Sequence, residues 1–245
     1  YWLDRFVGAG SIGEVYRAVD LFLRRPYAAK VVALRERRAD ARALVEREAA
    51  VLARIDNPHV VRVFELHELE QDRLLLVSDF VDGATLERLV ARGGPLRPTR
   101  ALDLARQVAQ GLSSVHDAGM VHRDVKPSNL IVQELPAGGC FVRIVDFGLV
   151  RIRGVLERDG VYGTPAFAAP EQLVAGRDVD QRADVYALGL VLMYALTGVA
   201  PAAESVDELA RARVATPGAA PLLERAIERL PGVAALGPLV LAMTE

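Results

Sequence analysis

Strand-like patterns gather in the first third of this chain and helical patterns in the rest. Alternating or β-branched apolar residues, which favour strands, occupy 6–17, 27–34, 60–66 and 73–80. Helical periodicity marks 37–55 and, after Asp82-Gly83, the ranges 86–92, 99–118 and 181–196. Strands and helices that segregate along a chain are typical of α+β architectures, not of alternating parallel sheets. We therefore predict a bilobal α+β fold, with a β-rich N-lobe that holds one main helix and an α-rich C-lobe.

The composition is that of an ordinary globular protein. The 245 residues suffice for one large domain or two lobes, and 51% are hydrophobic while 25% are charged. A net charge of -2 argues against nucleic acid as a partner. Cys140 is the only cysteine, so an intrachain disulfide is excluded and a reducing compartment is expected. We expect a cytoplasmic protein, with any membrane anchor of a full-length protein lying outside this fragment.

The uncharged range 185–203 approaches the length of a membrane span. Gly189, Gly198 and Pro201 interrupt it, and Asp184 directly precedes it. A helix that is apolar all round is also the pattern of a helix buried in a large domain. We therefore predict a buried helix and no membrane segment in this chain. The oligomeric state stays open, with a dimer as one alternative.

The stretch 122–129, His-Arg-Asp-Val-Lys-Pro-Ser-Asn, carries the strongest chemical signal. It places Asp124, Lys126 and Asn129 on one loop, and Asp146 follows after a hairpin's length of chain. Two carboxylates and an amide can position magnesium and a hydroxyl nucleophile, while a lysine adds positive charge near a phosphate. Phosphoryl transfer needs mostly such positioning and charge stabilisation.

A glycine pattern lies near the N-terminus. Backbone amides there would cover phosphates, and the pattern consists of Gly8, Ala9, Gly10, Ser11, Ile12 and Gly13. The same spacing serves dinucleotide-binding folds, in which the third glycine opens a helix. Here residues 14–17 continue as a strand, which argues against that alternative. A flexible hairpin turn is the other interpretation of this weak motif.

Lys30 stands on an otherwise apolar strand, where a lone lysine is usually a surface residue. Glu48 changes that interpretation, because it shares a helical stripe with Leu44 and Leu52. A lysine held by this glutamate would reach nucleotide phosphates as a fixed cation. Glu46 is the competing partner, but it lies off the stripe.

Taken together in their order, these motifs resemble the catalytic domain of the protein kinase superfamily, and in particular the eukaryotic-like serine/threonine protein kinases of bacteria. Further matches are Ala28-Ala29-Lys30, Asp146-Phe147-Gly148, Ala169-Pro170-Glu171, and the landmarks at 163–167 and 184–186. The resemblance covers nearly the whole chain. It implies one kinase domain over 1–245, with an N-lobe at 1–80, a hinge at 79–83 and a C-lobe at 84–245.

The resemblance also implies roles for single residues. Asp124 would orient the substrate hydroxyl and accept its proton, with Lys126 beside the transferred phosphate. Lys30, positioned by Glu48, would contact the phosphates of ATP. Asn129 and Asp146 would hold Mg²⁺, with Mn²⁺ as an alternative ion.

The base of the nucleotide would lie between Val15, Ala28 and Ile131. Asp79 and Val81 would offer hinge backbone groups to it, behind a small gatekeeper at Ser78. Taken singly, these residues are equally compatible with ordinary core and linker packing.

Histidines are not expected to take part in catalysis. His122 is the first residue of the 122–129 stretch, but the resemblance implies that it packs against Phe147. His59, His67 and His116 are scattered singly and predict no metal site.

Lys126 and Thr164 match serine/threonine kinases and differ from tyrosine kinases. We predict an ATP-dependent protein serine/threonine kinase that transfers the γ-phosphate to a protein hydroxyl in bacterial signalling. The alternative is a pseudokinase that acts as a nucleotide-binding switch or scaffold, although Lys30, Asp124, Asn129 and Asp146 are all present. A small-molecule kinase would not normally carry the 163–171 segment.

The chain departs from the family pattern in two places. Arg123 commonly pairs with a phosphorylated residue of the activation segment, yet between Gly148 and Glu171 the only hydroxyl side chains belong to Tyr162 and Thr164. We hypothesise that Glu157 or Asp159 supplies the negative charge instead.

The second departure is at the C-terminus. Family members usually continue past the 239–243 helix to an arginine that pairs with the glutamate matching Glu171. We expect that this last helix is missing and that the chain is a domain of a longer protein.

Overall fold

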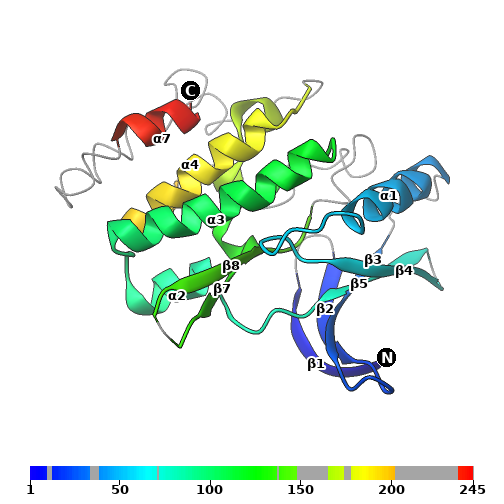
Figure 1. Cartoon of the computed structure of the whole chain (residues 1–245). Coiled ribbons are helices and arrows are strands. Elements are labelled where there is room, and N and C mark those ends of the chain that lie inside the picture. The colour runs from blue at the N-terminus through cyan, green and yellow to red at the C-terminus, as the bar shows by residue number, and fades with distance from the viewer. Residues whose placement is uncertain are drawn as a thin grey trace. The chain divides into compact units, whose positions relative to one another are not determined.

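The computed structural model describes residues 1–9, 13–33, 39–70, 72–136, 138–147, 165–173, 178–201 and 237–244. Over these ranges the chain forms two compact units. The first spans Tyr1–Asp82, and the second begins at Gly83. Figure 1 labels their helices and strands. Strands dominate the first unit and helices the second, as the segregated patterns predict.

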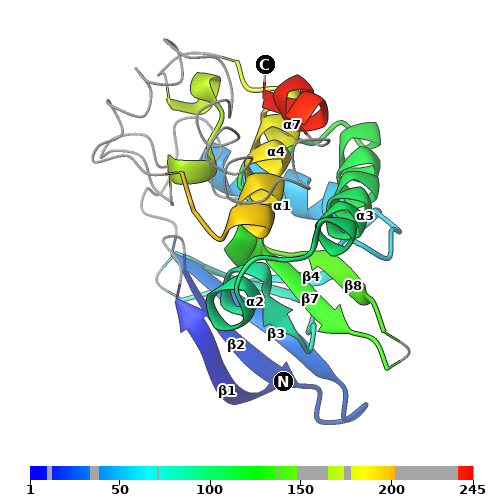
Figure 2. The same cartoon turned by 90° about the vertical axis from the view of Figure 1, so that its left-hand side faces the viewer.

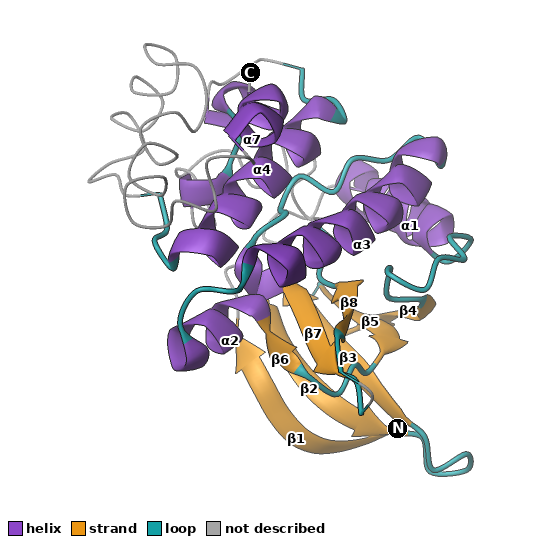
Figure 3. Ribbon diagram, turned by 60° about the vertical axis from the view of Figure 1, so that its left-hand side comes forward, coloured by secondary structure: helices purple, strands orange, loops and turns teal. Residues whose placement is uncertain are grey.

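The first unit is a five-stranded antiparallel sheet with one described helix (Figure 3). The strand order is β1-β2-β3-β5-β4, so β1 and β4 form its edges. The strands are β1 (Trp2–Ala9), β2 (Gly13–Val19), β3 (Pro26–Ala33), β4 (Val63–Leu69) and β5 (Arg73–Asp79). The helix is α1 (Ala39–Leu52), where the sequence pattern predicts one.

The core of this unit follows the period-two alternation of its central strands. Ala29 on β3 and Val77 on β5 are paired neighbours and are both buried. Leu52 on α1 is buried as well. Where β2 begins, Gly13 pairs with Val32, and a Cβ added at Gly13 would lie 2.1 Å from the carbonyl oxygen of Val31. Only glycine therefore fits at this end of the glycine pattern.

One strand starts later than predicted. The β-branched residues at 60–61 favour a strand from residue 60, yet β4 begins at Val63. The cause is local: Asn57 accepts the backbone N–H of His59 on its side chain and that of Val60 on its backbone. Val60 and Val61 are buried but precede β4.

The second unit combines helices with a small sheet. Its described helices are α2 (Leu86–Gly93), α3 (Pro98–Asp117), α4 (Arg182–Thr197) and α7 (Gly237–Thr244). The sheet has the order β6-β7-β8, formed by β6 (Ala84–Thr85), β7 (Leu130–Glu134) and β8 (Cys140–Ile144). Short 3-10 turns cover Pro127–Asn129, Pro165–Phe167 and Pro170–Leu173. The periodicity of the sequence did not predict this sheet.

Helix α4 is the predicted buried helix. It is enclosed along nearly its whole length, with α3 and α7 packed against it (Figures 1 and 2). Gly198 ends it in the left-handed conformation, with φ of 70°. None of the helices in the described ranges is long and apolar enough to cross a membrane.

Candidate active site

The loop between α3 and β7 holds three of the predicted residues together. Asp124 is 9% exposed, and its Oδ2 accepts a hydrogen bond from Nζ of Lys126 at 2.9 Å. Nδ2 of Asn129 donates to the same oxygen at 3.1 Å and to the backbone oxygen of Asp124 at 2.9 Å. A cation and an amide thus orient one carboxylate. Because the Lys126 side chain is only 14% exposed, this pair is little screened by solvent.

Backbone geometry brings Asn129 next to Asp146. In the β7–β8 hairpin, Leu130 pairs with Ile144, and the N–H of Val145 donates to the backbone oxygen of Asn129 at 2.9 Å. Asp146 follows directly, with a left-handed φ of 62°. Such a conformation is costly for a non-glycine residue and marks a position that the surrounding structure fixes.

These two side chains suit a hard divalent cation. Nδ2 of Asn129 is used as a donor, so its Oδ1 is the ligand atom that this side chain can offer. The carboxylate of Asp146 adds further oxygen atoms. The described residues contain no cluster of three or more His, Cys, Asp or Glu side chains arranged for a metal. A site built on Asn129 and Asp146 would therefore need substrate or water oxygens to complete it.

The loop at 122–129, here called the catalytic loop, is anchored by a buried acidic residue on α4. Asp184 is 1% exposed, and its carboxylate accepts the backbone N–H groups of His122 and Arg123, each at 2.8 Å. Nε2 of His116 contacts the same carboxylate at 2.8 Å. The sequence identified Asp184 only as a family landmark and missed this role. The sequence signal for this role was the position of Asp184 directly before a long apolar stretch.

His122 is buried and structural, as predicted. Its ring lies 4.6 Å from that of Phe147, centroid to centroid. Nδ1 accepts the N–H of Asp124 at 3.2 Å, and Nε2 lies 3.3 Å from the backbone oxygen of Val145. Burial lowers the pKa of the imidazole. A neutral ring that accepts at Nδ1 and donates at Nε2 satisfies both contacts.

A second contact missed by sequence reasoning comes from the turn that contains Glu171. Nε2 of Gln172 donates to the backbone oxygen of Arg123 at 2.8 Å, and its Oε1 accepts the N–H of Ala169 at 3.0 Å. The 165–173 segment is thereby joined to the catalytic loop. No sequence signal singled out Gln172.

In the first unit, the sheet register gathers the residues predicted to contact the nucleotide. Lys30 on β3 pairs with Val15 on β2, and Ala28 pairs with Ser78 on β5. Since side chains alternate along a strand, Val15, Ala28 and Lys30 lie on one face of the sheet. All three are half-buried.

The two candidate glutamates on helix α1 differ in their environments. Glu48 is half-buried near the buried Leu52. Glu46 is exposed and hydrogen-bonds with Nε of Arg42 at 2.8 Å. Each glutamate therefore has a distinct environment, and Glu46 is engaged on its own helix.

The remaining predicted residues divide between described and undescribed parts of the chain. Asp79 ends β5, Val81 is buried in the segment that follows, and Ile131 is half-buried on β7. Gly8 and Ala9 end β1. Residues outside the described ranges are Gly10, Ser11, Ile12, Gly148, Glu157, Asp159, Tyr162 and Thr164, together with the side chain of Leu44.

A β-rich unit and a helical unit that carries an Asp-Lys-Asn loop define the class of bilobal phosphotransferases. The protein kinase domain model matches residues 1–221, so the chain belongs to the protein kinase family. It is 36% identical over 226 residues to serine/threonine-protein kinase PknD of Mycobacterium tuberculosis, covering 90% of this chain and 33% of that protein. It is 34% identical over 211 residues to serine/threonine-protein kinase pkn3 of Myxococcus xanthus, covering 82% and 38% respectively.

Solved structures agree with this assignment. The crystal structure of the Mycobacterium tuberculosis PknI kinase domain matches 99% of this chain and 86% of its own chain, with a TM-score of 0.73 and 26% identity. Rad53 in complex with AMP-PNP matches 85% of this chain and 51% of its own, with a TM-score of 0.70 and 28% identity. The resemblance inferred from the motifs and the α+β bilobal fold class are thus confirmed. The chain spans about a third of the length of the curated relatives.

Proposed function

We propose that this chain is the catalytic domain of a protein serine/threonine kinase that transfers the γ-phosphate of ATP to a protein hydroxyl. The carboxylate of Asp124, held by Lys126 and Asn129, is the observation that carries the proposal. Curated relatives of the chain bear the name serine/threonine-protein kinase. Membership of the protein kinase family implies binding of ATP with a divalent metal.

Each residue on the catalytic loop has a distinct task in this proposal. Asp124 orients the acceptor hydroxyl and takes its proton, while Lys126 stabilises the negative charge that develops on the transferred phosphoryl group. Asn129 and Asp146 would hold Mg²⁺, which neutralises phosphate charge when it is bound. The anchoring by Asp184 keeps the loop in place during the reaction.

In the first unit, Lys30 would contact the phosphates and Glu48 would position it. The engagement of Glu46 with Arg42 supports this choice of glutamate. Val15 and Ala28, on the same sheet face as Lys30, would cover the base.

The acceptor class follows from Lys126, which lies two residues after Asp124 as in serine/threonine kinases. The thiol of Cys140 is buried and free of disulfides, which supports action in the cytoplasm. Bacterial signalling is the context that fits the named relatives.

The decisive test compares the wild type with the Asp124→Asn variant in labelled ATP, Mg²⁺ and a generic basic protein acceptor. We expect phosphorylation of Ser or Thr by the wild type and about a thousandfold lower rate in the variant, with nucleotide binding retained. Asp117→Asn, an exposed acid at the end of α3, is the matched control and should keep full activity.

Two results would contradict the proposal. Nucleotide binding without any transfer by the wild type, including autophosphorylation, would indicate the pseudokinase instead. Transfer to a small-molecule alcohol but not to protein would indicate a different class of acceptor.

A further inference from the structure

The side chain of Asp79, the first residue of the predicted hinge, is held by an arginine from a distant turn. Nη2 of Arg25 donates to Oδ1 of Asp79 at 3.1 Å, across 54 positions of sequence. The backbone N–H of Asp79 donates to the carbonyl oxygen of Arg62 at 3.0 Å. The Asp79 side chain is only 18% exposed, so solvent screens its attraction to the guanidinium less than it would at an open surface.

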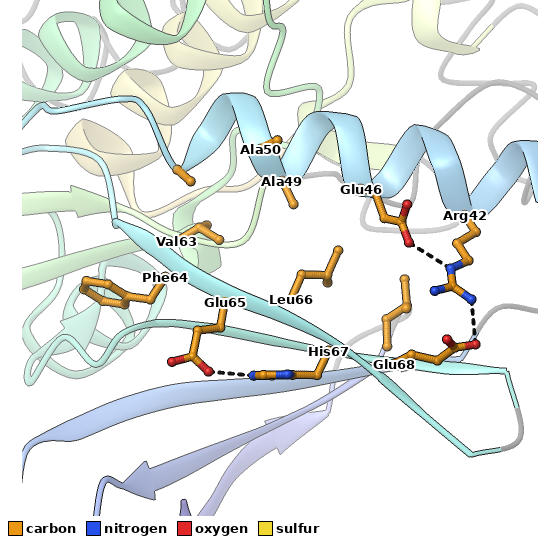
Figure 4. Close-up of a pocket in the computed structure, with 12 residues that line it drawn as sticks. Arg42, Glu46, Ala49, Ala50, Val63, Phe64, Glu65, Leu66, His67 and Glu68 are labelled. Carbon is orange, nitrogen blue, oxygen red and sulfur yellow. Dashed lines mark hydrogen bonds and ion pairs between the residues drawn. The ribbon is translucent and has the colours of Figure 1, made fainter.

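Two aromatic rings position the guanidinium of Arg25. Its Cζ lies 5.5 Å from the ring centroid of Tyr27 and 5.7 Å from that of Phe64. The two rings are in edge contact with each other, 5.3 Å apart. Phe64 comes from β4, where it directly precedes Glu65 (Figure 4). An isolated surface ion pair contributes little, but contact with two rings restricts the guanidinium before it pairs with the carboxylate.

The turn between β2 and β3 presents Arg25 to these partners. Oδ1 of Asp20 accepts the backbone N–H groups of Phe22 at 2.8 Å and of Leu23 at 2.7 Å. The N–H of Asp20 donates to the carbonyl oxygen of Arg25 at 3.0 Å and closes the turn. Side-chain hydrogen bonds of this kind stabilise a turn locally, so Arg25 leaves the turn from a defined backbone position.

A second arginine contacts the next residue of the hinge. Cζ of Arg17 on β2 lies 5.5 Å from the ring centroid of Phe80, and its Nη1 pairs with Asp4 on β1. Arg17 pairs with Ala28 in the sheet and therefore shares a face with Val15 and Ala28. This is the face on which we place the base of the nucleotide.

The two arginines hold the hinge from opposite faces of the sheet. Arg25 lies over Tyr27, which directly precedes Ala28 on β3 and pairs with Asp79 on β5. Because side chains alternate along a strand, Tyr27 lies on the other face from Arg17. Two consecutive hinge residues are thus tied to the same sheet by independent contacts.

We propose that Arg17 and Arg25 are positioning residues for the nucleotide. By holding Phe80 and Asp79, they keep the backbone of residues 79–81 in the conformation that hydrogen-bonds to the adenine base. This inference rests on the proposed function, in which Asp79 and Val81 offer their backbone groups to the base. If the hinge adopts that conformation only part of the time, the apparent affinity falls by the same fraction.

Adenosine is the direct probe, because it carries the base but no phosphate. In titrations followed by NMR, we expect Arg25→Gln, Asp79→Asn and Arg17→Gln each to weaken adenosine binding about fivefold. The double variant Arg25→Gln/Asp79→Asn should bind no more weakly than either single variant, since both changes remove one contact. Arg24→Gln, at the exposed neighbour in the same turn, is the matched control and should bind as the wild type does.

Kinetics separate positioning of the base from a loss of folded protein. The base is remote from the transferred phosphate, so its contacts act equally on the bound substrate and on the transition state. The Arg25→Gln and Arg17→Gln variants should therefore raise KM for ATP about fivefold and leave kcat unchanged. A purely structural role would lower kcat through a smaller active fraction and leave KM unchanged.

An adenosine affinity equal to that of the Arg24→Gln control would overturn the inference for whichever of Arg17 and Arg25 shows it. A fall in kcat at unchanged KM would overturn it as well. A wild type that binds adenosine but transfers no phosphate, with both variants weakened as expected, would contradict the proposed function and support the role of the two arginines. A wild type that binds no adenosine would overturn both.

Discussion

The backbone N–H of Arg123 donates to Oδ1 of Asp184 at 2.8 Å, although the two residues lie 61 positions apart. Arg123 adopts a left-handed φ of 63°, which is unfavourable for a residue with a side chain. A buried carboxylate that accepts two successive backbone N–H groups can hold the loop in this conformation. The backbone of the catalytic loop at Arg123 is therefore stabilised from α4, in addition to the hydrogen bonds that His122 and Asn129 make within the loop.

Asp184→Asn should damage both stability and catalysis. Asparagine has nearly the same volume as aspartate, but its NH₂ group would face a backbone N–H group of the loop. That N–H group would then lose the oxygen that accepts its hydrogen bond. We expect the free energy of unfolding to fall by about 3 kcal/mol. The rate of phosphoryl transfer should fall about a hundredfold because Asp124 shifts. Urea denaturation and the kinase assay measure the two effects, and Asp117→Asn is the control for both. Unchanged transfer would show that the anchor does not position the loop.

His122 should make the protein less stable at mildly acidic pH. Its pKa in the folded state is lowered by burial, whereas the unfolded chain has the ordinary histidine pKa of about 6.5. Below that pH the unfolded state binds a proton that the folded state resists, so the free energy of unfolding falls as the pH decreases, by at most about 1.4 kcal/mol per pH unit. Denaturation at several pH values should show this slope below pH ~6.5.

The His122→Asn variant should be less stable overall but should lose part of this pH dependence. His67→Asn replaces an exposed histidine and is the matched control. An equal slope in the wild type and in the His122→Asn protein would assign the pH dependence to other groups.

Gly189→Ala should loosen the packing of α7 on α4. A Cβ at this position would lie 2.7 Å from Cγ2 of Thr244 and 3.1 Å from Cβ of Met243. Alanine improves helix propensity by about 1 kcal/mol, but the clash costs about 2 kcal/mol, so we expect a net loss of about 1 kcal/mol. Adding Thr244→Ser removes Cγ2 and keeps the hydroxyl that donates to Val240. The double variant should regain stability in thermal unfolding. A double variant that is less stable than either single variant would contradict this packing account.

Gln107 should prove essential to the small sheet. Its Oε1 accepts the N–H of Val142 at 2.9 Å, and its Nε2 donates to the backbone oxygen of Cys140 at 3.0 Å, so α3 pairs with the edge strand β8. Replacing Gln107 by leucine removes its hydrogen bonds to the N–H of Val142 and to the backbone oxygen of Cys140. The free energy of unfolding should fall by about 3 kcal/mol. The exposed Gln110 on the same helix gives the control Gln110→Leu. If both substitutions cost the same, helix hydrophobicity and not the β8 contact would explain the loss.

Much of the fold could be predicted from the sequence, because its local patterns are consistent with one another. Apolar periodicity located α1, α3 and α4 to within a few residues, since one buried face imposes its spacing on the chain. The buried position of His122 against Phe147 followed from the family resemblance, and the ring contact confirms it. The predicted start of β4 was wrong, because Asn57 accepts hydrogen bonds from the backbone N–H groups of His59 and Val60 in a turn.

Residue types and their order along the chain thus determined the family, the fold class and the candidate catalytic residues. Only the tertiary structure showed that Asp184 anchors the loop around Arg123 and that Gln172 joins it. It also showed that Arg25 reaches Asp79 at the end of β5. These features depend on contacts between segments far apart in the sequence. Such contacts form only when the packing of helices and strands brings the partners within hydrogen-bonding distance, and no local pattern encodes them.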